Sequence, residues 1–304
     1  MKTILTILAL LFISAFSFAQ NPFPSKELTD QVYKRKLAVQ LFPVNNSLDS
    51  LLNEDLKEII KSSWQISEVE FMTPEQINRV NNNPKYALLI HGDTLKNVRV
   101  SHTRTVPGGG YYYRDTYVAF TFSFYNFTLT LKAGDEDKTV TDIGFANGDL
   151  SRSDFIYLCQ QLNNLLTASR NNVPKSTFYD VPSNIEKCKT YTLVLLEDLF
   201  KPEDRENMSK LYTGKYKFVK GAEYEKIIAD RQPQMGYVKI IWSNQHRLYL
   251  WIVVDAENGR VISQMGFGGV SFGSEQHANE IIKGKHLKYC QDKFSQNLNN
   301  RYRL

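Results

Sequence analysis

The sequence predicts an α/β protein built from two tandem units, each with the element order β-α-β-α-β-β-β-α and a mixed sheet. Short apolar runs alternate with amphipathic helical patterns along most of the chain. The segments "SSWQISEVEFMTPEQINRV" (62–80) and "KLYTGKYKFVKGAEYEKII" (210–228) both end a helix on an aromatic residue, cross a short strand ending in Phe, and open another helix. "LTLKAGDEDKTVTDIGF" (129–145) and "IVVDAENGRVISQMGF" (252–267) share a strand, an acidic turn, a strand and Gly-Phe. We interpret these matches as an internal duplication.

The first residues predict export. Lys2 precedes an apolar stretch from Ile4 to Phe18, and small residues stand at Ser17 and Ala19. This is the layout of a secretory signal peptide, and it is too short to cross a membrane as a helix. We therefore expect a signal peptide at 1–19, an N-terminal arm at 20–35, and a mature protein in the periplasm, secreted, or at the outer membrane.

The first unit is predicted at 36–166. "KLAVQLFPV" (36–44) is typical of a buried strand, and leucines and isoleucines at three- and four-residue steps predict an amphipathic helix of about 17 residues after it. Thr73, Pro74 and Gln76 predict a capped helix after the strand "SEVEFMT". Three further strands at 86–90, 117–131 and 141–145 and a closing helix with Phe155 and Leu162 complete the unit.

The second unit repeats this order at 188–304, after a linker at 167–187 that is rich in Ser, Asn and Pro. We expect strands at 190–200, 215–219, 237–242, 247–254 and 261–267. A short helix from Pro202, a helix over "AEYEKIIADR", and a closing helix from about Glu275 to Asn297 are expected between and after them.

The stretch "TVPGGGYYYRDTY" (105–117) is the most unusual in the chain. It belongs to an insertion at about 94–116 that the second unit lacks. Residues before and after it alternate between apolar and polar, so we expect a long hairpin with Gly108, Gly109 and Gly110 at its tip. Tyrosine offers contact area together with a hydroxyl. We therefore predict partner binding by four consecutive residues: Tyr111, Tyr112, Tyr113 and Arg114. The alternative is a solvated loop without function.

No motif indicates catalysis, a cofactor or a metal, so we assign no residue to those roles. The five histidines have no metal-ligand spacing and are expected at the surface, and acids such as Asp255 and Glu257 fall in turns, where solvation explains them. The net charge of +5 comes without a basic tract, which gives no support for nucleic-acid binding. Cys159 and Cys290 are expected as equivalent core thiols and Cys188 as a free linker thiol, with a bridge between the first two left open.

"LAVQLFPVNNSLDSLLNEDLKEIIKSSWQISEVEFMTPEQI" (37–77) resembles the opening of the TolB N-terminal domain and of the curli-secretion-channel family, with a strand of the type "AV-x-x-F" before an amphipathic helix. The chain also resembles secreted Bacteroidota proteins of unknown function, in the "SFAQ" ending of its leader and in Trp64 followed by Glu-Phe at 70–71. "LVLLEDLF" (193–200) in the second unit departs from the strand pattern. The resemblance implies an envelope location and a role in protein–protein interaction, and it carries no catalytic residues.

The sequence thus favours an exported, non-enzymatic scaffold or binding protein of the bacterial envelope, with an envelope protein or a glycan as its partner. Two other classes stay open. A hydrolase would have its site between the two units, and titrating carboxylates in a shared cleft would favour it. A component of an oligomeric outer-membrane assembly would form ring-like oligomers in detergent.

Overall fold

A computed structural model describes residues 22–108, 111–133, 138–146, 149–179, 187–243, 248–266, 275–276 and 287. Between 93 and 127 the description is of the backbone. The predicted signal peptide, most of the predicted closing helix and Cys290 lie outside the described residues.

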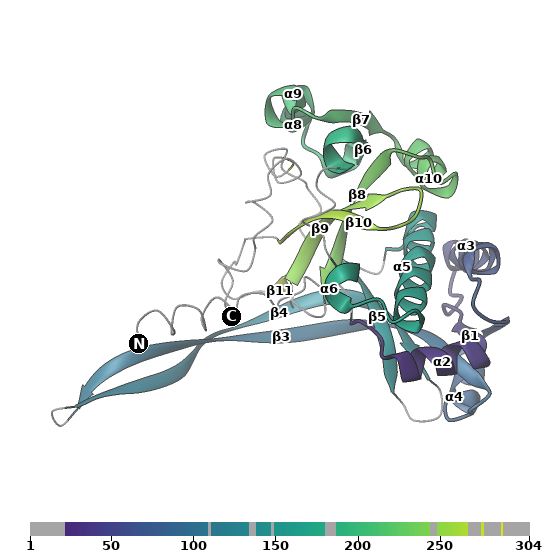
Figure 1. The fold of residues 1–304 in the computed structure, drawn as a ribbon, viewed down its shortest axis with the longest axis horizontal. Coiled ribbons are helices and arrows are strands. Elements are labelled where there is room, and N and C mark those ends of the chain that lie inside the picture. The colour runs from purple at the N-terminus through teal and green to yellow at the C-terminus, as the bar shows by residue number, and fades with distance from the viewer. Residues whose placement is uncertain are drawn as a thin grey trace.

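The described chain is a mixed α/β structure with one continuous sheet (Figure 1). The strands, in chain order, are β1 Lys36–Gln40, β2 Val69–Met72, β3 Tyr86–Gly108, β4 Tyr111–Lys132, β5 Thr139–Phe145, β6 Thr192–Leu196, β7 Lys215–Val219, β8 Met235–Ser243, β9 Leu248–Asp255, β10 Val261–Gly266 and β11 Glu275–Gln276. The helices are α2 Lys26–Lys34, α3 Ser47–Ser63, α4 Pro74–Val80, α5 Arg152–Arg170, α6 Lys175–Phe178, the 3-10 turn η1 Glu197–Leu199, α8 Pro202–Glu206, α9 Met208–Leu211 and α10 Gly221–Ala229.

The two halves of the sheet have the same topology. In the first half β1 lies between β2 and β3 and is parallel to both, and β4 and β5 follow β3 antiparallel. In the second half β6 lies between β7 and β8 and is parallel to both, and β9 and β10 follow β8 antiparallel. This repeat agrees with the pairs of matching segments in the sequence, although descent from one duplicated unit stays a prediction.

The halves join through β5 and β8. Gly144 pairs with Trp242 and Phe145 with Ile241, at the end of β8 that β6 does not reach. A β-carbon on Gly144 would collide with the backbone carbonyl of Trp242. Glycine at this position therefore lets β5 and β8 approach closely. The pairing that joins the two halves requires a residue without a β-carbon here.

The main core runs through both halves. One cluster of buried side chains contains Leu37 and Val39 of β1, Leu158 of α5, and Val194 and Tyr237 of the second half. Helix α5 lies against α2, α3 and α10, so it is covered by elements of both halves (Figure 1). Two smaller clusters line the opposite sheet face, one in each half. The halves are thus not separate lobes, because they share the core around α5.

Local signals in the sequence place many elements correctly. Asn46 caps α3, and Thr73 and Gln76 form the predicted capping box of α4 through Gln76 Oε1 and the Thr73 N–H, 2.8 Å apart. The helix expected from Pro202 is instead two short helices that break at Asn207. Glu275 and Gln276 do not begin a helix. They form β11 beside Ser123 and Phe124 of β4, whose edge would otherwise leave backbone groups unpaired.

Candidate functional site

The strands β3 and β4 form a hairpin far longer than the sheet that holds it (Figure 1). Backbone pairing continues from Leu88–Lys132 at the base to Gly108–Tyr111 at the outer end. β1 pairs with β3 only as far as Leu89, and β5 with β4 only as far as Phe127. We call the part of the ribbon beyond that base the arm (residues 94–126). β11 is the one other described strand that pairs with the arm.

The four predicted binding residues lie at the outer end of the arm. The backbones of Tyr111, Tyr112, Tyr113 and Arg114 pair with those of Gly108, Pro107, Val106 and Thr105. The predicted hairpin geometry is therefore present at these positions, although nothing in the structure tests their role. A two-stranded ribbon is marginally stable alone in water, and its edges present backbone donors and acceptors to other chains.

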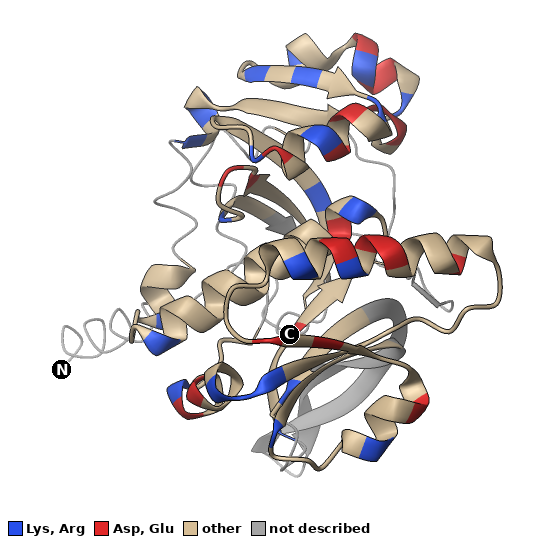
Figure 2. Ribbon diagram, turned by 90° about the vertical axis from the view of Figure 1, so that its right-hand side faces the viewer, with Lys and Arg blue, Asp and Glu red and all other residues tan. Residues whose placement is uncertain are grey.

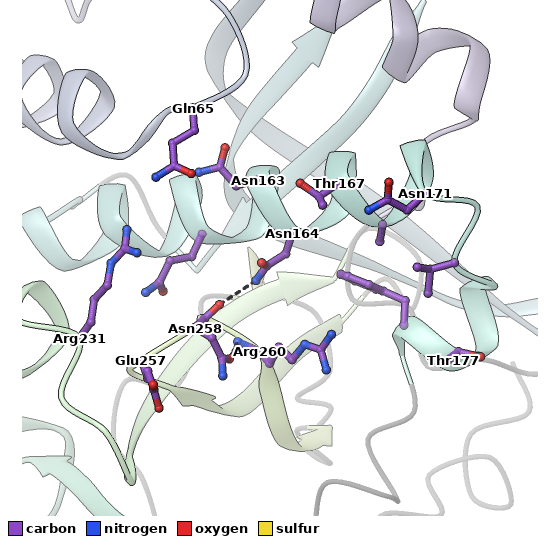
Figure 3. A pocket seen from close by; sticks show the side chains of 14 residues that line it. Gln65, Asn163, Asn164, Thr167, Asn171, Thr177, Arg231, Glu257, Asn258 and Arg260 are labelled. Atoms are coloured by element: carbon purple, nitrogen blue, oxygen red, sulfur yellow. Dashed lines mark hydrogen bonds between the residues drawn. The ribbon is translucent and has the colours of Figure 1, made fainter.

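A second candidate site lies where the two halves meet. It is a cavity of about 500 Å³ between α5, the segment that follows it, and the turn that joins β9 to β10 (Figure 3). We call it the amide cavity, because Gln65, Gln160, Asn163, Asn164, Asn171 and Asn258 line it. Figure 3 shows Asn163, Asn164, Thr167 and Asn171 along α5, opposite Asn258 and Arg260.

The turn opposite α5 is held by a buried acid. Asp255 is fully buried, and its carboxylate accepts hydrogen bonds from the Glu257 N–H, from Asn258 Nδ2 at 2.8 Å and from the Tyr191 hydroxyl at 3.0 Å. Burial, and then the neighbouring Asp255, raise the pKa of Tyr191 to about 12. The expectation of a solvated Asp255 is therefore wrong, because its side chain folds back into the turn as an Asx motif.

Side chains of α5 fix this turn against the first half. Gln161 Nε2 donates to the Gly259 carbonyl at 2.6 Å, and Asn164 Nδ2 donates to the Asn258 carbonyl at 2.9 Å. Gly259 has a φ of 73°, and a β-carbon there would collide with the Gln160 side chain. The left-handed backbone and the close approach both require glycine. The walls of the amide cavity are thus positioned by tertiary contacts that no sequence motif announces.

Charge in the amide cavity comes from Arg231, Arg260 and Glu257. Glu257 is the one carboxylate among the described residues that line it. Arg231 has a φ of 50° because it closes helix α10: its N–H donates to the Ile228 carbonyl and the Gln232 N–H to the Ile227 carbonyl, as in a Schellman motif.

The histidine and cysteine residues singled out in the sequence pack against other parts of the fold wherever their side chains are described. His91 is half-buried, with its ring stacked on Phe42 at a centroid distance of 4.1 Å, so it is partly covered at the surface rather than freely exposed. Cys159 is buried as expected and burial raises its pKa to about 12, while Cys188 is also fully buried. Within the described ranges, no group of three or more His, Cys, Asp or Glu residues is arranged to hold a metal ion.

No family model, no curated protein and no solved structure matches the chain. The resemblance to the TolB N-terminal and curli-secretion-channel domains therefore stays a prediction. Among the described helices, none is long and apolar enough to cross a membrane.

Proposed function

We propose that the chain is an exported, non-enzymatic binding protein of the bacterial envelope, which uses the β3–β4 arm to hold a protein partner. The observation that carries this proposal is the length of the ribbon. Its strands have 23 and 22 residues, and their pairing continues to Gly108–Tyr111, far beyond the reach of β1 and β5. The predicted signal peptide supports the location, and the repeated sheet topology supports a rigid base for the arm.

The chemistry of the arm favours a protein over a small molecule. Partner strands can pair with the exposed edge of a ribbon through backbone hydrogen bonds, while side chains select the partner. The sequence adds three tyrosines and an arginine at the outer end, and these residue types are enriched where interfaces gain most of their affinity. The open edge and these side chains together favour an arm that binds its partner along the edge and recognises it through the side chains at the tip.

The proposal is tested by shortening the arm without disturbing its register. Thr105 and Arg114 are paired, so replacing Val106–Tyr113 by Asn-Gly gives a two-residue turn between them. A second variant replaces Tyr111, Tyr112 and Tyr113 by Ser and keeps the arm at full length. Both should retain the circular dichroism spectrum and melting temperature of the mature protein, from Gln20 onward.

Each variant and the mature protein are then used to capture partners from an envelope extract. We expect a specific partner with the mature protein and its loss with both variants. Equal capture by all three proteins would refute the role of the tip. The open edges also favour self-association, so the mass of the pure protein in detergent shows whether the partner is a second copy in an oligomeric assembly.

A further inference from the structure

The cavity-facing side of α5 is polar along three turns. Gln160, Asn164, Thr167 and Asn171 stand at steps of four, three and four residues, with Asn163 beside Asn164, so they share one side; Asn171 directly follows the end of the helix at Arg170. A helix packed between two halves of a protein normally presents apolar residues on such a side. Amides there need hydrogen-bond partners, because a buried polar group without one is unfavourable.

The amide side chains differ in how many of their donors and acceptors have hydrogen-bond partners within the protein. Gln160 accepts from the Tyr237 hydroxyl at 3.3 Å and donates to the Ala256 carbonyl at 3.3 Å, so both ends of its amide are engaged. Asn163 Nδ2 donates to the Ser63 carbonyl at 2.7 Å, which fixes the orientation of the amide. Its Oδ1 is buried and has no hydrogen-bond partner among the described residues. That oxygen has almost no accessible surface, so the cavity does not present it to a ligand.

The two arginines add an unused positive charge. Arg231 and Arg260 line the cavity together with a single described acid, Glu257, and neither guanidinium forms a salt bridge with a described residue. Figure 3 shows them on opposite sides of Asn258. A guanidinium presents parallel N–H donors that match a carboxylate, so the lining favours a ligand with an acidic group.

The geometry points to the amide cavity as a binding site for an acidic saccharide of about two sugar units. Sugar hydroxyls donate and accept, as the Asn and Gln amides do, and the carboxylate of a uronate would lie against Arg231 or Arg260. A volume of about 500 Å³ suits a ligand of this size. Phe178, packed edge-on against Phe23 and Tyr179, adds an apolar ring to the lining for the C–H face of a sugar.

A peptide fits this lining less well. A peptide bound by strand addition is held through backbone groups of a strand edge, whereas the polar groups here are side chains of a helix and a turn. The saccharide site is also separate from the arm, so it does not depend on the proposed function. The protein with Asn-Gly in place of Val106–Tyr113 should still bind the saccharide.

The test is calorimetric titration of the mature protein with uronate-containing disaccharides of galacto and gluco configuration, each beside its neutral counterpart. We expect saturable binding of at least one acidic disaccharide and weaker binding of its neutral counterpart. At least one of R260Q and R231Q should weaken binding by about tenfold to a hundredfold, because the arginine that faces the carboxylate supplies charge-assisted hydrogen bonds. R79Q changes an exposed arginine on α4 outside the cavity and serves as the matched control.

Several results would overturn the inference. These are no binding of any acidic disaccharide, equal binding of acidic and neutral sugars, or no greater loss of affinity in R260Q and R231Q than in R79Q. If an extended acidic peptide binds at the cavity and none of the sugars displaces it, the site belongs to another ligand class. Circular dichroism of each variant shows whether a lost affinity reflects a lost fold.

Discussion

Lys239 Nζ of β8 lies 2.5 Å from Asp154 Oδ1 of α5, in an ion pair that joins the two halves of the protein. The two side chains are 8% and 15% exposed, so water screens the pair little. The Lys239 ammonium also lies 5.7 Å from the centre of the Tyr157 ring. Asp154 accepts from the Ser151 N–H at 2.8 Å, which ties the pair to the start of α5. Figure 2 shows charges of both signs interspersed along the helices nearby.

Replacing Lys239 by Met should destabilise the protein by about 3–5 kcal/mol, because it leaves the Asp154 carboxylate buried without its partner. Urea denaturation measures the loss. The matched control is K226M, which breaks the exposed Lys226–Asp230 pair on α10 and should cost less than about 1 kcal/mol. Similar losses in the two variants would show that the buried pair contributes no more than a surface one.

Replacing Gly144 by Ala should destabilise the protein by about 1–3 kcal/mol, since the added methyl group meets the Trp242 backbone at the joint of β5 and β8. A β-carbon on Gly92 of β3 would meet no described atom within 4 Å, so G92A should change the free energy of unfolding by less than about 0.5 kcal/mol. If G144A unfolds at the same urea concentration as the unmodified protein, the close joint between the halves is not a constraint.

Glu225 should make stability depend on pH. Burial, and then the nearby Asp55 and Asp154, raise its pKa above the ordinary 4.5, although Arg152 and Lys239 oppose this. The folded state therefore holds the proton more tightly than the unfolded state does. The stabilisation from protonated Glu225 is fully present below 4.5 and is lost as the pH rises through the folded pKa.

Replacing Glu225 by Gln should thus raise the urea midpoint at pH 7, and the gain should shrink as the pH falls toward 4. The control is E223Q on the same helix, which removes an exposed partner of Lys217 and should lower stability slightly or leave it unchanged. An E225Q gain that is constant between pH 4 and pH 8 would contradict the raised pKa.

The sequence predicts elements well where the information is local. The amphipathic period of α3, the capping box at Thr73 and the alternation on either side of the tip of the arm each depend on residues a few positions apart. The amide cavity depends on contacts between residues far apart, such as Gln161 with Gly259, and no spacing along the chain announces them. The role of Lys239 could not be predicted from the sequence for the same reason. It lies within the apolar strand β8, and its partner Asp154 belongs to the other half.

The end of the arm is the proposed point of contact with a partner in the envelope. The most direct measurement places a photo-crosslinking amino acid at Tyr112 in cells, with Arg79 on α4 as the matched control position. We expect a discrete crosslinked product from position 112 that is absent from position 79. No product at 112, or the same product from both positions, would contradict it.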